Sequence, residues 1–168
     1  MSSLSLAHVA PCLLAVGLVT LGGCGSNEYG VVPVAGTVTF DGQPPPTAGR
    51  VTFTPNESFG GLPRRPGVGR FREDGAFSVT SFKEGDGLIP GRYQVTVSCM
   101  AGMPDISQRD ASASVTYVAE GFEPEPLVVE LGSDPIAFNL DVPLNQEVAK
   151  KFQRQQGADA RAKSTREN

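Results

Sequence analysis

The sequence predicts an all-β protein, a Greek-key β-sandwich of seven or eight short strands. Apolar and polar residues alternate with a period of two in several stretches, which is typical of strands buried on one face. Turn dipeptides, above all Asp-Gly, separate these stretches. The 168 residues include 20 glycines and 14 prolines, and only 19% are charged. This composition favours short strands and turns over a helical bundle.

Residues 1–23 are predicted to be a secretory signal peptide. Residues 9–21 form a thirteen-residue apolar run. Such a run is shorter than the roughly 20 residues of a membrane-spanning helix and fits the hydrophobic region of a signal. It ends in Leu21-Gly22-Gly23-Cys24, which resembles a bacterial lipobox. The alternative is a buried apolar strand that ends by coincidence in Gly-Gly-Cys.

The lipobox resemblance implies a lipid anchor at Cys24. It implies diacylglyceryl transfer to the Cys24 thiol, cleavage between Gly23 and Cys24, and acylation of the new amine. Several acyl chains bind a membrane durably, so we expect a membrane-anchored protein of the cell envelope. Gly25 stands where Asp is the inner-membrane retention signal of enteric bacteria, which favours the outer membrane, with the domain periplasmic or surface-facing. Residues 24–30 are the lipidated cysteine and a short linker.

Residues 31–142 are predicted to be the β-sandwich domain. Its first two strands, in residues 31–40 and 50–55, are expected to pair through a turn at Asp41-Gly42, with a proline run following the turn. A second hairpin is expected in residues 70–82, around Asp74-Gly75, and a further turn at Asp86-Gly87. The inward positions of these strands are Val32, Val34, Val38, Phe40, Val51, Phe53, Phe77 and Val79.

The clearest strand is residues 91–99, with Tyr93, Val95, Val97 and Cys99 inward. Residues 100–126 read as loop, apart from a short strand at 114–118. Two further strands are predicted near the end of the domain. The inward residues of the first are Leu127, Val129 and Leu131. Those of the second are Ile136, Phe138, Leu140 and Val142.

Residues 143–168 are predicted to be a basic tail. Leu144, Val148 and Phe152 recur at every fourth position, which predicts about two helical turns that end at Gly157. The remainder of the tail is expected to be disordered.

Three segments carry a family resemblance: GTVTFDGQPPPTAGRVTFTP, EDGAFSV and IPGRYQVTVS. They resemble the carboxypeptidase regulatory-like, or transthyretin-like, β-sandwich domain, which reads as strand, Asp-Gly-x-Pro, strand, then DG-x-F and G-x-Y-x-V-x-V. Behind a lipobox, this domain is similar to the short predicted lipoproteins of planctomycete bacteria. The resemblance covers residues 31–142 and implies a prealbumin-like sandwich. Its motifs are turn and core features, which specify a fold better than a function.

No catalytic residue, metal site or cofactor is expected. The sole histidine, His8, lies in the segment predicted to be removed, which excludes a His-based triad or zinc site from the mature chain. Cys99 lies in an inward register and is interpreted as a buried small hydrophobe, with a reactive nucleophile as the alternative. Asp41, Asp74 and Asp86 each precede Gly, so turn roles explain them without Ca²⁺.

The leading hypothesis is a non-enzymatic, lipid-anchored binding module that contacts protein or glycan through the loops 56–69 and 100–126. Residues 56–69 form a long Gly- and Pro-rich loop with Arg64 and Arg65 at its centre, read either as a solvated loop or as an anion or glycan contact. Outside the basic tail the chain carries 8 Lys/Arg against 15 Asp/Glu, which argues against nucleic acid. No small-molecule substrate is expected. The alternatives are a surface coat formed by lateral self-association and, ranked last, a carboxylate-based hydrolase.

Overall fold

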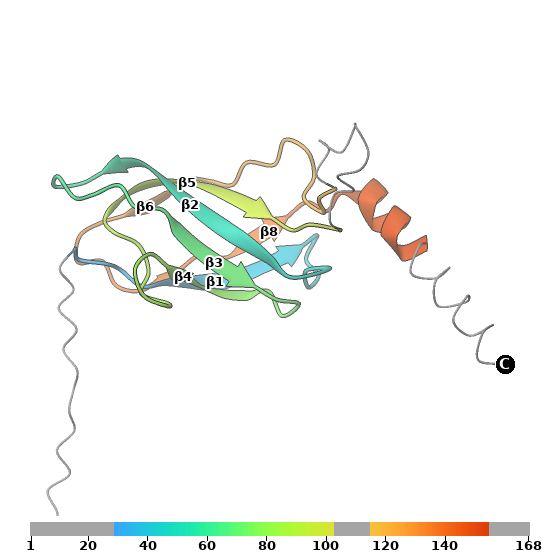
Figure 1. The fold of residues 1–168 in the computed structure, drawn as a ribbon, viewed down its shortest axis with the longest axis horizontal. Helices are drawn as coiled ribbons and strands as arrows, with labels where there is room; N and C mark the ends of the chain where they lie inside the picture. Colours follow the sequence, from blue (N-terminus) through green and yellow to red (C-terminus); the bar gives the residue numbers. More distant parts are fainter. Residues whose placement is uncertain (1–28, 103–114, 155–168) are drawn as a thin grey trace, which may run out of the picture.

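The structure, a computed structural model, describes residues 29–102 and 115–154. Within these residues the chain is mostly β, with eight strands in one curled, mixed sheet and one short helix at 146–154 (Figure 1). This confirms the all-β expectation. The strands are β1 (Val34–Phe40), β2 (Gly49–Ser58), β3 (Gly67–Phe71), β4 (Ala76–Thr80), β5 (Gly91–Ser98), β6 (Leu127–Val129), β7 (Ile136–Ala137) and β8 (Leu140–Val142).

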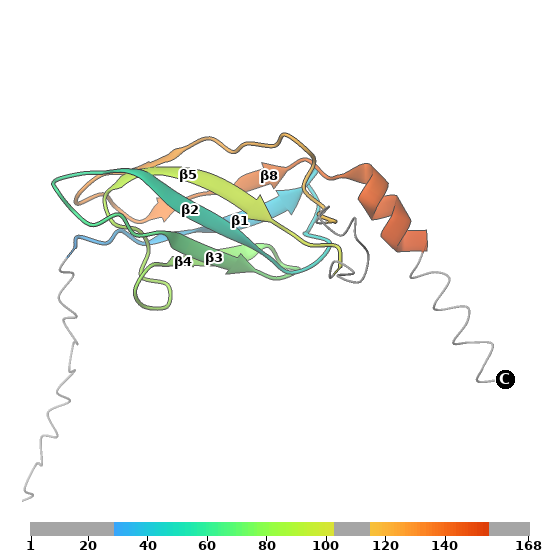
Figure 2. The same cartoon turned by 45° about the horizontal axis from the view of Figure 1, so that its top comes forward.

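The strands follow the order β6-β5-β2-β3-β4-β1-β7 across the sheet, and β8 also pairs with β1. The pairs are antiparallel except at β1, which is parallel to both β7 and β8. Two views show that the described chain begins at one end of the sheet and that the helix lies at the other (Figure 1, Figure 2). No described helix has the length and hydropathy needed to cross a membrane.

The expected pairing of the first two strands is wrong. β1 pairs with β4, whereas β2 pairs with β3 and β5. The turn between them does form: Asp41 and Gly42 have φ of 48° and 73°, and the N–H of Phe40 donates to the carbonyl of Gln43 at 2.8 Å. The prolines at 44–46 have no N–H to donate, so they end this short hairpin. The chain then crosses to a different part of the sheet.

The second predicted hairpin is confirmed. β3 and β4 pair in antiparallel fashion around Asp74-Gly75, with Val68 opposite Thr80. The Asp74 carboxylate accepts the N–H of Ala76 at 3.2 Å, and Gly75 has a φ of 73°. The turn therefore depends on the two residues that predicted it.

Two aspartates join the start of the domain to its end. Asp141, in β8, accepts the hydroxyl of Thr39 at 2.7 Å and the N–H of Gly42 at 2.8 Å. These two hydrogen bonds hold the pKa of Asp141 below its ordinary value. In return Asp41 accepts the N–H of Leu144 at 3.2 Å and the side-chain amide of Gln146 at 2.9 Å. The first turn and the segment from β8 to the start of the helix therefore bind each other reciprocally.

The last predicted strand is divided into β7 and β8, which follow one another along the same edge of β1. At the break, the side-chain oxygen of Asn139 accepts the N–H of Thr37 at 3.0 Å in place of a backbone carbonyl. The Phe138 carbonyl approaches Gly36 so closely that a Cβ there would lie 1.9 Å from its oxygen. Gly36 is therefore required where the two backbones meet.

Most of the predicted inward positions form the core. Those of the first four strands are buried, as are Tyr93, Val95 and Cys99 in and just after β5. Val97 is half-buried and packs against the core, as do Ile136, Phe138 and Leu140, while Val142 is buried. Leu131 is a wrong assignment, because its side chain is 73% exposed. β6 ends at Val129, and the chain turns at Gly132 instead of continuing the alternation.

Residues 115–118, which follow the undescribed range 103–114, connect the helix to the domain. Of the strand expected at 114–118, Ser114 lies outside the described residues, and the rest makes isolated bridges, Thr116 with Met100 and Val118 with Leu144. The predicted helix is confirmed. Asn145 caps it by accepting the N–H of Val148 at 3.2 Å, and Phe152 packs edge-on against Tyr117. Gly157 and the expected disordered end lie outside the described residues.

Tyr93 fixes the entry into β5. Its ring is buried, and its hydroxyl donates to the carbonyl of Ile89 at 2.7 Å, four residues upstream. If the donor is removed, the buried carbonyl has lost its hydrogen bonds to water and gains none in return, which lowers the free energy of unfolding.

We predict that Tyr93→Phe lowers the free energy of unfolding by about 1–3 kcal/mol, because the Ile89 carbonyl loses its partner. Tyr29→Phe is the matched control, since the half-buried Tyr29 acts through its ring and should change stability by less than about 0.5 kcal/mol. Urea unfolding of both variants measures the difference. Equal effects of the two substitutions would contradict the role given to the Tyr93 hydroxyl.

Candidate functional site

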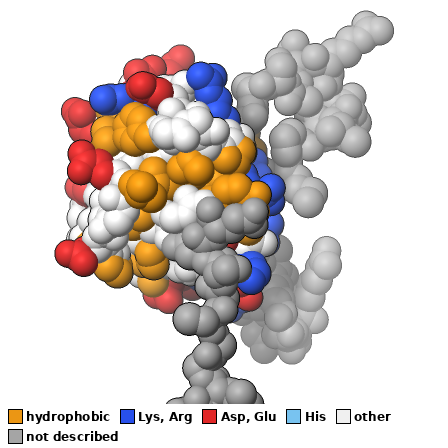
Figure 3. All heavy atoms as spheres, turned by 90° about the vertical axis from the view of Figure 1, so that its left-hand side faces the viewer, with side chains coloured by type: hydrophobic (Ala, Val, Ile, Leu, Met, Phe, Trp, Pro, Cys, Tyr) orange, Lys and Arg blue, Asp and Glu red, His pale blue; other side chains and the backbone are white. Residues whose placement is uncertain are grey.

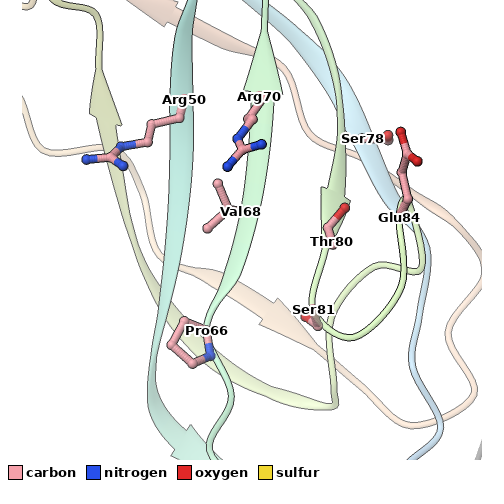
Figure 4. Close-up of a pocket in the computed structure, with 8 residues that line it drawn as sticks. All are labelled: Arg50, Pro66, Val68, Arg70, Ser78, Thr80, Ser81 and Glu84. Carbon is pink, nitrogen blue, oxygen red and sulfur yellow. The ribbon is translucent and has the colours of Figure 1, made fainter.

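A groove of about 670 Å³ crosses the outer face of β2, β3 and β4 (Figure 4). The period-two alternation produces it, because it turns the apolar residues of these strands inward and their polar neighbours outward. On β2, Val51 and Phe53 are buried while Arg50 is exposed. The groove is lined by Arg50, Pro66, Val68, Arg70, Ser78, Thr80, Ser81 and Glu84.

Arg50 and Arg70 lie directly opposite each other on β2 and β3, and both are exposed. Like charges in this position destabilise a sheet. Neither guanidinium forms an ion pair within the part of the chain that the structure describes, whereas Arg92 lies 3.9 Å from Glu57. An anion in the groove would relieve the repulsion between the two arginines.

Hydroxyl-bearing residues lie on the strands to either side of the arginine pair. Ser98 on β5 lies opposite Arg50, and β4 contributes Ser78 and Thr80. The Thr80 hydroxyl accepts the N–H of Gly85 at 3.0 Å, so its own proton can be donated to a ligand. The Ser81 hydroxyl is already used, because it is buried and donates to the carbonyl of Gly87 at 2.7 Å.

Asp86 shapes the loop at one rim of the groove. Its carboxylate accepts the N–H of Ser81 at 2.7 Å, of Phe82 at 3.0 Å and of Lys83 at 2.9 Å. Burial raises the pKa of Asp86, but these backbone N–H groups, together with that of Gly87, lower it to a net value below the ordinary one. Asp86 is therefore an ionised turn residue whose hydrogen bonds keep the rim in one conformation.

The two arginines singled out by the sequence lie beside the groove, not in it. Arg64 and Arg65 are exposed in the loop between β2 and β3. The Nε–H of Arg65 donates to the carbonyl of Ser81, and its guanidinium lies over the Phe82 ring, 4.3 Å from the centroid. The same ring stacks on Tyr29 at 5.2 Å. Arg65 therefore joins the loop to the Asp86 rim.

Sequence reasoning missed Arg50 and Arg70. The signal for each was present, since Arg50 precedes the inward Val51 and Arg70 precedes the buried Phe71. The outward register of both strands could be assigned from these neighbours. Their juxtaposition could not, because it depends on which residues of β2 and β3 face each other.

The aspartates at turns have the role expected of them. Asp74 and Asp86 accept hydrogen bonds within their own turns. Asp41 has the positive φ of 48° that its turn requires, and its carboxylate accepts hydrogen bonds from the distant Leu144 and Gln146. Across residues 29–102 and 115–154 no group of three or more His, Cys, Asp or Glu side chains could hold a metal ion.

Of the three cysteines, the structure describes Cys99 alone. Cys12 and Cys24 lie outside the described residues, as does Gly23, so the predicted lipidation and cleavage sites have no structural account. Cys99 is buried and its thiol donates to the carbonyl of Thr47 at 3.5 Å. Burial raises the pKa of Cys99 to about 11, against a smaller lowering by this hydrogen bond. The full burial of its side chain confirms Cys99 as a buried small hydrophobe.

No family model, no curated protein and no solved structure matches this chain.

We predict that the free energy of unfolding falls as pH rises above about 9, by up to about 1.4 kcal/mol per pH unit for the Cys99 thiol alone. The unfolded thiol releases its proton near its ordinary pKa of 9.0, whereas the folded thiol keeps it until about 11. The unfolded state therefore binds fewer protons in this window, and stability is lost. Urea unfolding from pH 8 to 10.5 measures the slope.

Cys99→Ala is the control for this pH dependence. The variant is less stable at every pH because a buried group is shortened, but its stability should fall less steeply than that of the parent chain above pH 9. Parallel curves for the two chains would show that the thiol keeps its ordinary pKa in the folded state.

Proposed function

We propose that this protein is a non-enzymatic, lipid-anchored protein of the cell envelope. It binds an acidic polysaccharide through the groove that Arg50 and Arg70 line, called the arginine groove below. The observation that carries the proposal is the exposed pair Arg50 and Arg70, placed opposite each other without an acidic partner among the described residues. A guanidinium group binds carboxylate or sulfate through two parallel hydrogen bonds. The two residues lie on neighbouring strands, and the Arg50 side chain extends away from Arg70 (Figure 4). Two such separated groups suit a chain that repeats its anionic groups at intervals.

The rest of the groove favours a glycan over a protein segment. Ser78 and Thr80 can exchange hydrogen bonds with sugar hydroxyls, and the apolar lining is limited to Val68 and Pro66. Protein partners usually anchor a large apolar or aromatic side chain in a desolvated pocket. The groove is open and polar and provides no such pocket.

We also propose that the domain is a Greek-key β-sandwich of the transthyretin-like, carboxypeptidase regulatory-like kind. Two contacts support this. The hydrogen bond from the Tyr93 hydroxyl to the Ile89 carbonyl resembles the tyrosine corner of Greek-key sandwiches. Phe53 on β2 meets Phe138, between β7 and β8, with ring centroids 5.6 Å apart, although β3, β4 and β1 separate these strands in the sheet. The sheet therefore curls until its distant parts share one core.

The proposed anchor is Cys24, with cleavage after Gly23 and residence in the outer membrane. The lipobox-like Leu21-Gly22-Gly23-Cys24 and the apolar run before it support this assignment. The first strand, β1, begins at Val34, so cleavage before Cys24 removes no part of the sheet. A triacylated cysteine would hold the groove at the membrane surface.

The two alternatives have weaker support. Lateral self-association needs a long exposed edge, but the edge strands β6, β7 and β8 have 3, 2 and 3 residues. A carboxylate-based hydrolase needs two acids around the scissile bond, and Glu84 is the sole acidic residue lining the groove.

We predict that the full chain binds polygalacturonate and dextran sulfate, and that Arg50→Gln with Arg70→Gln weakens binding by about 10- to 100-fold or more, since two charge-assisted hydrogen-bonding groups are lost. Neutral dextran should not bind. Isothermal titration calorimetry at fixed salt measures each affinity.

The matched control for this binding is Arg72→Gln with Arg154→Gln, which removes the same charge from exposed positions that do not line the groove. An equal loss in the control pair would indicate unspecific attraction and contradict the groove as the site. Tighter binding of polyglutamate than of polygalacturonate would assign the groove to an acidic protein segment instead.

We predict that the mature chain begins at Cys24 and carries a diacylglyceryl group and an N-acyl group. Mass spectrometry of the protein produced in a lipoprotein-processing bacterium measures this. Cys24→Ser should remain unprocessed and unlipidated, whereas Cys12→Ser should mature normally, because its cysteine lies in the removed segment. An N-terminus elsewhere would refute the anchor.

A further inference from the structure

An apolar surface lies at the end of the domain where the described chain begins. Leu131 is 73% exposed and Phe82 39% exposed, and Tyr29 stacks on Phe82. A Cβ at Gly30 would lie 2.6 Å from Cδ1 of Leu131, so the leucine lies against the residue that follows Tyr29. Tyr29, Phe82 and Leu131 are called the end surface below. Seen from this end, hydrophobic side chains form several groups on the surface, separated by polar ones (Figure 3).

The end surface is held rigidly to the sheet. Arg65 lies over Phe82 and donates to the Ser81 carbonyl, so the ring on which Tyr29 stacks is fixed to the Asp86 rim. Leu131 extends from the turn that follows β6. Water-exposed leucine and phenylalanine on an ordered surface favour an apolar or interfacial environment.

The length of the predicted tether determines what this surface can reach. Tyr29 lies five positions after Cys24, and a fully extended chain of five residue steps spans at most about 18 Å. The ten residues of β2 span about 33 Å along the domain. The tether is therefore too short for the opposite end of the domain to face the membrane while the end surface faces away from it.

The residues around the end surface are those found at membrane interfaces. Aromatic rings and basic side chains are enriched at headgroup level, and the exposed Arg64, Arg65 and Lys83 lie within this loop cluster. Glu130 and Asp134 are exposed on either side of Leu131. These acids limit the contact to a shallow one in which the leucine enters the headgroup layer and the carboxylates stay in water.

We propose that the end surface rests on the lipid bilayer to which Cys24 is attached, with Leu131 inserted most deeply. The inference depends on the proposed lipid anchor and adds an orientation to it: the domain stands on the membrane on its Tyr29 end. The helix end then points away from the bilayer.

The sequence contains no tryptophan, so single tryptophans report on chosen positions. The full, lipidated chain with Leu131→Trp, Phe82→Trp or Met100→Trp is reconstituted in phosphatidylcholine vesicles that contain brominated phosphatidylcholine. Met100 is the control, because it is 36% exposed and follows β5 at the end opposite Gly91 and its neighbour Val129. Thermal unfolding verifies that each variant is folded, and flotation verifies membrane attachment.

We expect the brominated lipid to quench Trp at 131 at least about twofold more than Trp at 100, with Trp at 82 between them, because quenching requires near contact with the bilayer. Flotation with equal or no quenching at 131 and 100 would overturn the orientation while leaving the anchor intact. A chain that fails to float would overturn the anchor and the orientation together.

Discussion

The pairing of β1 with the last strands of the domain is the constraint on which the rest of this structure depends. β1 binds β4 on one side and β7 and β8 on the other, and the second set of bonds joins residues more than a hundred positions apart. Asp41 and Asp141 strengthen the same junction through reciprocal hydrogen bonds to backbone and side-chain donors. The sheet can curl around its core because this junction holds the strip of β7 and β8 against β1.

Closure of the core leaves the outer face free for another use. Inward positions on β2, β3 and β4 are filled by residues such as Val51, Phe71 and Val79, and their packing dictates nothing about the alternate positions. Those positions hold arginine and hydroxyl side chains in the groove. A pair of like charges that adds nothing to stability is more readily explained by binding than by folding.

The sequence predicted local features well and long-range ones poorly. The alternation at 93–99 and the Asp74-Gly75 turn need only neighbouring residues, and both agree with the structure. The partner of β1, the division of the last strand at Asn139 and the juxtaposition of Arg50 with Arg70 all depend on register between separate segments. The assignment of Leu131 to the inward face was wrong for a local reason, because the alternation does not continue beyond the end of β6 at Val129. The groove could therefore not be predicted from the sequence, because it depends on how β2, β3 and β4 are paired.

The junction at β1 also has a consequence for how the chain folds during synthesis. One edge of the first strand has its ladder completed by residues 136–142, which are among the last of the domain to be made. Parallel contacts between such distant segments close slowly. Until they close, the nascent domain presents an open β edge, which is a hazard for aggregation and a binding surface for chaperones.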